Sequence, residues 1–178
     1  MTADDLKPLI RAIPDFPKPG ILFRDVTTLI GHGAGFAAAT RLLADRARAV
    51  GADVIAGIEA RGFIFGAAVA ARLELPFVPV RKPGKLPVPV LAIDYALEYG
   101  TDTLEVDPDA IAEGQKVVVI DDLIATGGTA LAAVELLRRA GGVVTEALFV
   151  IDLPDLGGAD RLRAAGLTVE ALMDFEGD

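Results

Sequence analysis

Two adjacent carboxylates, followed by a turn rich in glycine and threonine, offer the clearest chemistry in this sequence. The acids are Asp121 and Asp122, directly after a β-branched run at residues 117–120. The turn comprises Ala125, Thr126, Gly127, Gly128 and Thr129. Free N–H groups where such a turn opens a helix bind a phosphate monoester, and ionised carboxylates accept hydrogen bonds from sugar hydroxyls. The stretch therefore predicts a ribose 5-phosphate site.

Each of these residues also has a simpler interpretation. The two acids could merely cap a turn, and the two glycines could be ordinary loop residues. Other phosphate loops fit less well, because the chain has no GxxxxGK[ST] motif and no GxGxxG after a predicted strand. The combination of carboxylates, glycines and threonines between a strand and a helix favours the functional interpretation.

The elements that must position these residues alternate between strands and helices. Apolar runs predict strands at residues 54–58, 77–80, 117–120, 144–151 and 169–173. The pattern of apolar residues predicts helices at residues 4–12, 34–50, 63–73 and 128–140, and a short helix from residue 159. Residues 91–97 and 104–106 are predicted to form a hairpin that leaves the sheet. This order predicts a doubly wound α/β fold, in which a mostly parallel sheet is flanked by helices and binds ligands at the carboxyl ends of its strands.

Composition limits the class of protein. With 178 residues and 52% hydrophobic residues, the chain is long enough for one domain over residues 1–178. The formal net charge of −9 argues against nucleic-acid binding, and the absence of cysteine fits a cytoplasmic protein. The acidic N-terminus does not resemble a signal peptide, and the longest apolar stretch, residues 63–71, is too short to span a membrane.

The acidic pair and its TGGT turn resemble the ribose-phosphate loop of the type I phosphoribosyltransferases. Five blocks along most of the chain resemble the adenine phosphoribosyltransferases within that family: residues 14–27, 57–66, 78–87, 97–105 and 121–129. This resemblance implies the type I phosphoribosyltransferase fold, with a small hood from the N-terminal and C-terminal segments and a flexible lid hairpin at about residues 81–106. It also implies purine salvage, in which adenine and 5-phosphoribosyl 1-diphosphate become AMP and pyrophosphate.

The resemblance also implies roles for individual residues. Pyrophosphate would be bound by Glu59, Ala60, Arg61, Arg81, Lys82 and Lys85. Adenine would be bound by Leu22, Phe23, Arg24 and Leu156, with Phe23 and Leu156 on opposite faces of the ring. The catalytic set would be Arg61, Asp121, Asp122 and Glu98, with Glu98 taking the proton of adenine and Tyr99 beside it in the lid. Without the resemblance, a solvated Arg61, a solvated basic loop, a core Phe23 and a water-facing Glu98 are the simpler interpretations.

The resemblance implies two further partners. Mg²⁺ would enter with the substrate, because this ion binds mainly through phosphate oxygens, and no direct protein ligand is expected. A homodimer is also expected. Two alternatives remain open: another purine or pyrimidine phosphoribosyltransferase, and a non-catalytic regulator that senses 5-phosphoribosyl 1-diphosphate.

Overall fold

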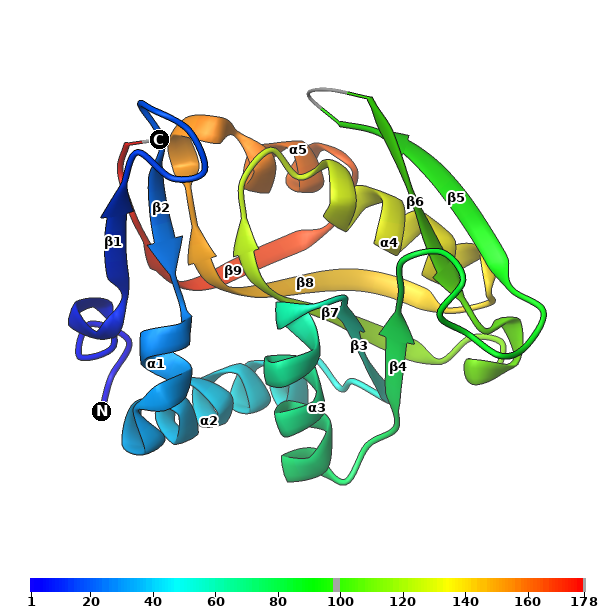
Figure 1. Cartoon of the computed structure of the whole chain (residues 1–178). Helices are drawn as coiled ribbons and strands as arrows, with labels where there is room; N and C mark the ends of the chain where they lie inside the picture. The colour runs from blue at the N-terminus through cyan, green and yellow to red at the C-terminus, as the bar shows by residue number, and fades with distance from the viewer. Residues whose placement is uncertain (98–99, 178) are drawn as a thin grey trace.

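A five-stranded parallel sheet forms the centre of the computed structural model, which describes residues 1–97 and 100–177. Its strands are β3 (Val54–Ile58), β4 (Phe77–Val80), β7 (Lys116–Ile124), β8 (Val143–Asp152) and β9 (Thr168–Asp174). They lie in the order β4-β3-β7-β8-β9, so the direction of winding reverses between β3 and β7 (Figure 1). This order confirms the predicted doubly wound α/β fold.

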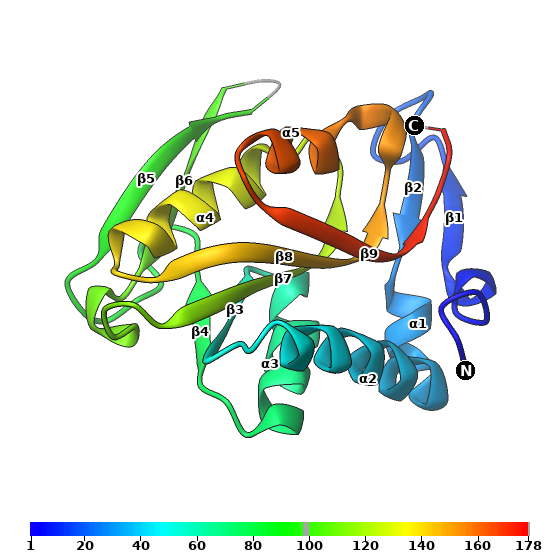
Figure 2. The ribbon, with the colours of Figure 1, turned by 180° about the vertical axis from the view of Figure 1, so that it is seen from behind.

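Helices cover both faces of the sheet (Figures 1 and 2). The pair α2 (Gly33–Ala49) and α3 (Arg61–Leu73) lies on one face, and α4 (Gly128–Arg139) and α5 (Gly158–Ala164) lie on the other. All of β3 is buried, with Val54, Ala56 and Ile58 in one core and Ile55 in the other. Because side chains alternate along a strand, a strand covered on both faces has a continuous apolar sequence.

The N-terminal strands form a separate antiparallel pair at one end of the sheet (Figure 1). β1 (Arg11–Pro14) pairs with β2 (Leu22–Asp25), and α1 (Thr27–Gly31) then leads into α2. The predicted helix at residues 4–12 is wrong, because only the 3₁₀ turn η1 (Lys7–Leu9) forms there. Pro8 has no N–H for a longer helix. The backbone of β1 is instead hydrogen-bonded to β2, which local periodicity could not indicate.

The predicted hairpin leaves the sheet between β4 and β7 as β5 (Leu91–Ala96) and β6 (Thr101–Val106). Its base is joined to the end of β4 by two backbone hydrogen bonds, from Arg81 N to Glu105 O (2.9 Å) and from Glu105 N to Arg81 O (2.8 Å). Two apolar side chains of β6 are fully buried in the core on the α4 side: Leu104 and Val106. The base of the hairpin is therefore part of the folded core.

Short 3₁₀ helices complete the connections, with η2 (Pro108–Ala110) before β7 and η3 (Pro154–Leu156) after β8. None of the helices in the described ranges has both the length and the apolar character that crossing a membrane requires.

Candidate functional site

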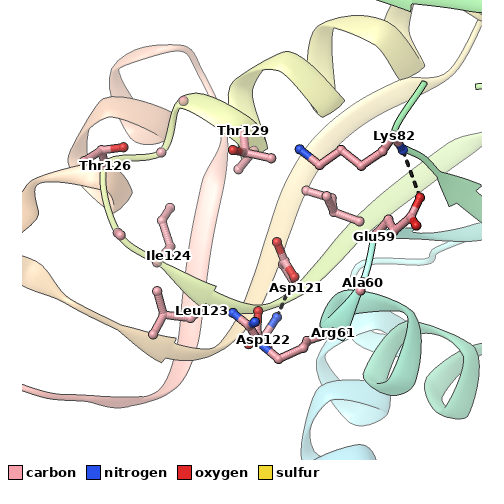
Figure 3. Close-up of a pocket in the computed structure, with 15 residues that line it drawn as sticks. Glu59, Ala60, Arg61, Lys82, Asp121, Asp122, Leu123, Ile124, Thr126 and Thr129 are labelled. Atoms are coloured by element: carbon pink, nitrogen blue, oxygen red, sulfur yellow. Dashed lines mark hydrogen bonds and ion pairs between the residues drawn. The ribbon is translucent and has the colours of Figure 1, made fainter. Parts of the chain in front are cut away.

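The candidate site lies where the winding of the sheet reverses. A cavity of about 260 Å³ opens between the loop after β3 and the end of β7 (Figure 3). In open α/β sheets this reversal leaves a crevice at the carboxyl ends of the strands, since the neighbouring crossover helices lie on opposite faces. The lining residues are Ile58, Glu59, Ala60, Arg61, Lys82, Asp121, Asp122, Leu123, Ile124, Ala125, Thr126, Gly127, Gly128, Thr129 and Ala130.

Both predicted carboxylates line this cavity, although the strand does not end before them. β7 continues to Ile124, because β8 still pairs with it beyond Asp121. On the other side, the last β3 partner of β7 is Gly57, opposite Ile120. Asp121 and Asp122 therefore lie inside β7 but beyond its last residue paired with β3, which leaves their side chains at the edge of the crevice.

The two carboxylates have different surroundings. The side chain of Asp122 is only 7% exposed and forms an ion pair with Arg61, whose side chain is 49% exposed. The carboxylate of Asp121 points into the cavity and accepts a hydrogen bond from Asp122 N at 2.9 Å (Figure 3). Burial raises the pKa of Asp121 well above its ordinary value, and the negative charge of Asp122 adds to this effect. Asp121 is thus the carboxylate available to a ligand, while Asp122 orients Arg61.

The predicted phosphate-binding turn also lines the cavity. Gly127 has a φ of +79°, which a residue with a side chain adopts only with strain, and α4 begins at the next residue. No side chain in the described chain caps this helix, so its first N–H groups remain available to an anion. The side chains of Thr126 and Thr129 lie on the same turn (Figure 3). This geometry is suited to a phosphate monoester.

A second glycine segment supports the turn from behind. A Cβ atom on Gly158 would lie 2.2 Å from the carbonyl oxygen of Ala125, so only glycine allows this contact. The guanidinium of Arg161 donates to the carbonyl oxygen of Thr126 at 3.4 Å. The sequence analysis assigned Leu156 to adenine and missed the supporting role of Gly158, the second of the two glycines that follow it. The paired glycines were the available signal, since adjacent glycines often mark close backbone approach.

The loop after β3 forms the opposite wall. Glu59, which has a cis peptide bond to Ala60, accepts hydrogen bonds from Lys82 N at 2.9 Å and Arg81 Nε at 3.3 Å. The hydrogen bond from Lys82 N lowers the pKa of Glu59 most, against the opposing effect of burial. A Cβ atom on Gly62 would lie 2.6 Å from Asp121 Oδ1, so this glycine lets α3 approach the acidic pair. Glu59 therefore orients the start of the basic segment and also lines the cavity, and its place at the pyrophosphate stays a prediction.

The predicted basic residues divide into two groups. Arg61 and Lys82 line the cavity, whereas Arg81 and Lys85 do not. The Arg81 guanidinium lies 5.8 Å from the centre of the Phe63 ring and donates to the carbonyl oxygen of Lys85 at 3.3 Å. A contact of Arg81 or Lys85 with pyrophosphate would require movement of this segment, so it stays a prediction.

The residues predicted to bind adenine lie outside the lining of the cavity. Leu22, Phe23 and Arg24 belong to β2, and Leu156 ends η3. The rings of Phe23 and Phe16 meet edge to face, with centroids 5.2 Å apart.

The C-terminal segment connects these two regions. Arg24 Nη2 donates to the carbonyl oxygen of Glu176 at 3.1 Å, and Gly177 N donates to Asp155 Oδ2 at 2.7 Å. The Phe175 ring also lies 4.6 Å from the Arg24 guanidinium. The hood predicted from the two chain ends is thus a contact between β2, the C-terminal segment and η3.

Two predicted residues, Glu98 and Tyr99, lie outside the described residues. The described flanks of this position are joined by a hydrogen bond from Leu97 N to Gly100 O at 3.0 Å. Within the described ranges, no group of three or more His, Cys, Asp or Glu side chains could hold a metal ion.

The fold and the cavity have the geometry of a site for a phosphorylated ribose, and comparisons with known proteins assign the family. A family model described as a phosphoribosyl transferase domain matches residues 25–161. The adenine phosphoribosyltransferase of Novosphingobium aromaticivorans is 73% identical over 177 residues, which cover 99% of each chain. The chain belongs to the adenine phosphoribosyltransferases of the phosphoribosyltransferase family.

Solved structures agree with this assignment. The crystal structure of adenine phosphoribosyltransferase from Thermoanaerobacter pseudethanolicus superposes with a TM-score of 0.92 at 46% identity, covering 98% of this chain and 100% of that chain. The enzyme from Saccharomyces cerevisiae, complexed with an imino-altritol bisphosphate and adenine, gives a TM-score of 0.88 at 39% identity, covering 96% of this chain and 98% of that chain. The type I phosphoribosyltransferase fold is therefore confirmed.

Proposed function

We propose that this chain transfers the 5-phosphoribosyl group of 5-phosphoribosyl 1-diphosphate to adenine, giving AMP and pyrophosphate. One observation carries the proposal: a single cavity has a carboxylate and a phosphate-binding turn on one wall, and Arg61 and Lys82 on the other. The turn suits the 5-phosphate of a ribose, the carboxylate suits its hydroxyls, and the two cations suit a diphosphate on the same sugar. Family membership supports adenine as the acceptor.

In the proposed reaction, the bond from the ribose C1 atom to the diphosphate oxygen breaks, and a bond from C1 to a ring nitrogen of adenine forms. Positive charge develops on the sugar, as in glycoside chemistry, and negative charge develops on the leaving diphosphate. Asp121 and Asp122 favour the first charge, and Arg61 and Lys82 favour the second. Asp122 contributes indirectly, because its ion pair fixes the direction of Arg61.

The attacking ring nitrogen must also lose its proton. We assign this step to Glu98, with Tyr99 beside it in sequence, because residues 97–105 resemble the corresponding block of the family. The lid proposed at about residues 81–106 includes both in sequence, so its closure would also bring Arg81 and Lys85 toward the diphosphate. A general base must come within hydrogen-bond reach of the proton that it removes.

For adenine, we propose a sandwich between Phe23 and Leu156, with groups around Leu22 and Arg24 at the edge of the ring. The C-terminal segment supports this proposal, because it connects β2 with η3 through hydrogen bonds at both ends. The Saccharomyces cerevisiae relative, which has been crystallised with adenine, shares 39% identity and the same fold.

Mg²⁺ is proposed to enter with the diphosphate substrate. Asp121, which lines the cavity, would hold such an ion through water, and the phosphate groups of the substrate would supply the other ligands. When bound, the ion would supply positive charge to the leaving diphosphate.

Three further properties are proposed: the oligomeric state, the number of domains and the location in the cell. A homodimer is proposed from family membership, and analytical ultracentrifugation tests it. One domain over the whole chain is supported by relatives that match it over 99% of their own length. The cytoplasmic location is supported by the absence of cysteine.

One assay separates the proposed function from its alternatives. Purified protein with 5-phosphoribosyl 1-diphosphate and Mg²⁺ is supplied with radiolabelled adenine, hypoxanthine or guanine, and nucleotide products are quantified. Adenine should be preferred by roughly 10³-fold or more in kcat/KM, because a site that pairs with an exocyclic amine leaves buried groups unpaired when a carbonyl replaces it. Equal use of hypoxanthine would contradict the adenine assignment. Binding of 5-phosphoribosyl 1-diphosphate without turnover of any base would favour a regulator.

A further inference from the structure

Among the described residues of β5 and β6, one charged residue lies on the inward face of the hairpin. In the β5–β6 register, Tyr95 is the direct partner of Asp102. The other inward residues of the hairpin are apolar and pack against the core: Leu91, Ile93, Leu104 and Val106. A carboxylate on an apolar packing face is costly unless a charge or hydrogen-bond donor compensates it. Asp102 therefore requires an explanation that packing does not provide.

The partner of Asp102 is the ammonium group of Lys82, which lines the candidate site. Lys82 Nζ forms an ion pair with Asp102 Oδ2 and donates a hydrogen bond to the Tyr95 hydroxyl at 3.0 Å. The Tyr95 hydroxyl donates to Asp102 Oδ2 at 3.2 Å and accepts from the Thr129 hydroxyl at 3.4 Å. Thr129 belongs to the first turn of α4, so this network connects the hairpin, the basic segment and the phosphate-binding turn.

The network fixes the carboxylate and leaves the ammonium partly free. Asp102 Oδ1 accepts a hydrogen bond from Thr103 N at 2.8 Å, so the backbone of the next residue holds the carboxylate in place. A lysine ammonium has three N–H donors, and the contacts with Asp102 and Tyr95 use two of them. Burial disfavours the charge of Lys82, but its hydrogen bonds to Asp102 and Tyr95 outweigh burial and raise its pKa. Counting partners among residues 1–97 and 100–177, Lys82 is thus a fixed cation with one N–H donor left for an anion in the cavity.

We propose that Asp102 and Tyr95 are positioning residues, which hold the Lys82 ammonium at the diphosphate position before the substrate binds. This inference rests on the proposed function, because it assigns the free N–H of Lys82 to the diphosphate. A lysine side chain loses considerable rotamer freedom when it is fixed, and here that loss occurs on folding, before the substrate binds. The hairpin therefore contributes to diphosphate binding through two residues of its strands, Tyr95 and Asp102.

A double-mutant cycle tests the coupling, with affinity for 5-phosphoribosyl 1-diphosphate in Mg²⁺ measured by isothermal titration calorimetry and KM measured for both substrates. Asp102→Asn should weaken diphosphate-substrate binding roughly tenfold, the scale of a lost charged hydrogen bond, with KM for adenine unchanged. Lys82→Ala should weaken binding at least as much. The combined variant should bind no more weakly than Lys82→Ala alone, because Asp102 acts through Lys82. Tyr95→Phe, a milder variant, should weaken binding about threefold.

Asp94→Asn is the matched control, since it removes the same charge from the same hairpin at an exposed position and should change affinity less than about twofold. Tighter binding by Asp102→Asn would show that Asp102 competes with the diphosphate, and would overturn the proposal. Independent effects of Asp102→Asn and Lys82→Ala, multiplying in the combined variant, would also overturn it. Absence of binding by the unaltered protein would instead contradict the proposed function.

Discussion

The candidate site combines two regions that are held in different ways. At the sheet edge, Asp121 and the phosphate-binding turn belong to β7 and α4, and close glycine contacts fix their backbone. The hairpin joins the sheet through two backbone hydrogen bonds at Arg81 and Glu105, and through the side-chain network around Lys82. Groups that stabilise charge gain most from a rigid position, whereas a lid must open for substrate entry. The comparison therefore predicts larger losses at the sheet edge than in the hairpin.

The largest effect is expected when both carboxylates at the sheet edge lose their charge. Asp121→Asn combined with Asp122→Asn should reduce turnover by roughly 10³-fold or more, because the charge that develops on the sugar loses its stabilisation and Arg61 loses its ion pair. Steady-state assays with adenine, and circular dichroism to verify the fold, measure this outcome. Normal turnover in a folded double variant would reduce both residues to turn-capping groups.

A smaller loss is expected when Glu98 loses its charge. Glu98→Gln should reduce kcat about 10²-fold, the range for loss of a general base, while affinity for 5-phosphoribosyl 1-diphosphate stays nearly constant. Single-turnover kinetics with direct binding measurements separate the two effects. If kcat is unchanged, the proton must pass to water or to the departing diphosphate, and the hairpin would serve binding alone.

The close contact of Gly158 with the phosphate-binding turn should affect both the stability of the fold and the binding of the substrate. Gly158→Ala places a Cβ 2.2 Å from the Ala125 carbonyl oxygen, and the resulting shift should cost ~1–3 kcal/mol and raise KM for 5-phosphoribosyl 1-diphosphate. Urea denaturation and steady-state kinetics measure the two consequences. Gly33→Ala is the control, since a Cβ there has open space and should change stability by less than ~1 kcal/mol. Equal behaviour of the two variants would contradict a close-packed turn.

The smallest expected effect is a change in how stability depends on pH. Burial raises the pKa of Asp121 above its ordinary value of 3.8, so the folded protein binds the proton more strongly than the unfolded chain. The stability that Asp121 contributes is fully present at pH values below its pKa in the unfolded chain. It is lost as the pH rises through the higher pKa of Asp121 in the folded protein. Asn at position 121 has no charge at either pH, so the Asp121→Asn variant avoids this loss of stability. The difference in Tm between this variant and the unaltered protein should therefore be larger at pH 7 than at pH 4, with the variant more stable. Thermal unfolding at the two pH values measures the difference, and a Tm below that of the unaltered protein at pH 7 would show that ionised Asp121 is stabilising.

Local sequence patterns predicted much of the sheet edge. The apolar runs matched β3 and β4 in full, and the TGGT turn leads directly into α4. These signals are local, because buried strands need continuous apolar residues and a tight turn needs glycine. The helix at residues 4–12 failed for the opposite reason, since pairing with β2 decided the structure of β1.

The sequence by itself determined the kinds of chemistry present: a carboxylate pair, a phosphate-binding turn and a set of basic residues. Only the tertiary structure decided which of them meet. Partners from separate segments placed Lys82 in the cavity, directed Arg81 onto Phe63 and separated the roles of Asp121 and Asp122. The physical reason is that residue type and short-range spacing follow from the chain, whereas burial, ion pairing and the reach of a side chain depend on neighbours that are distant in sequence.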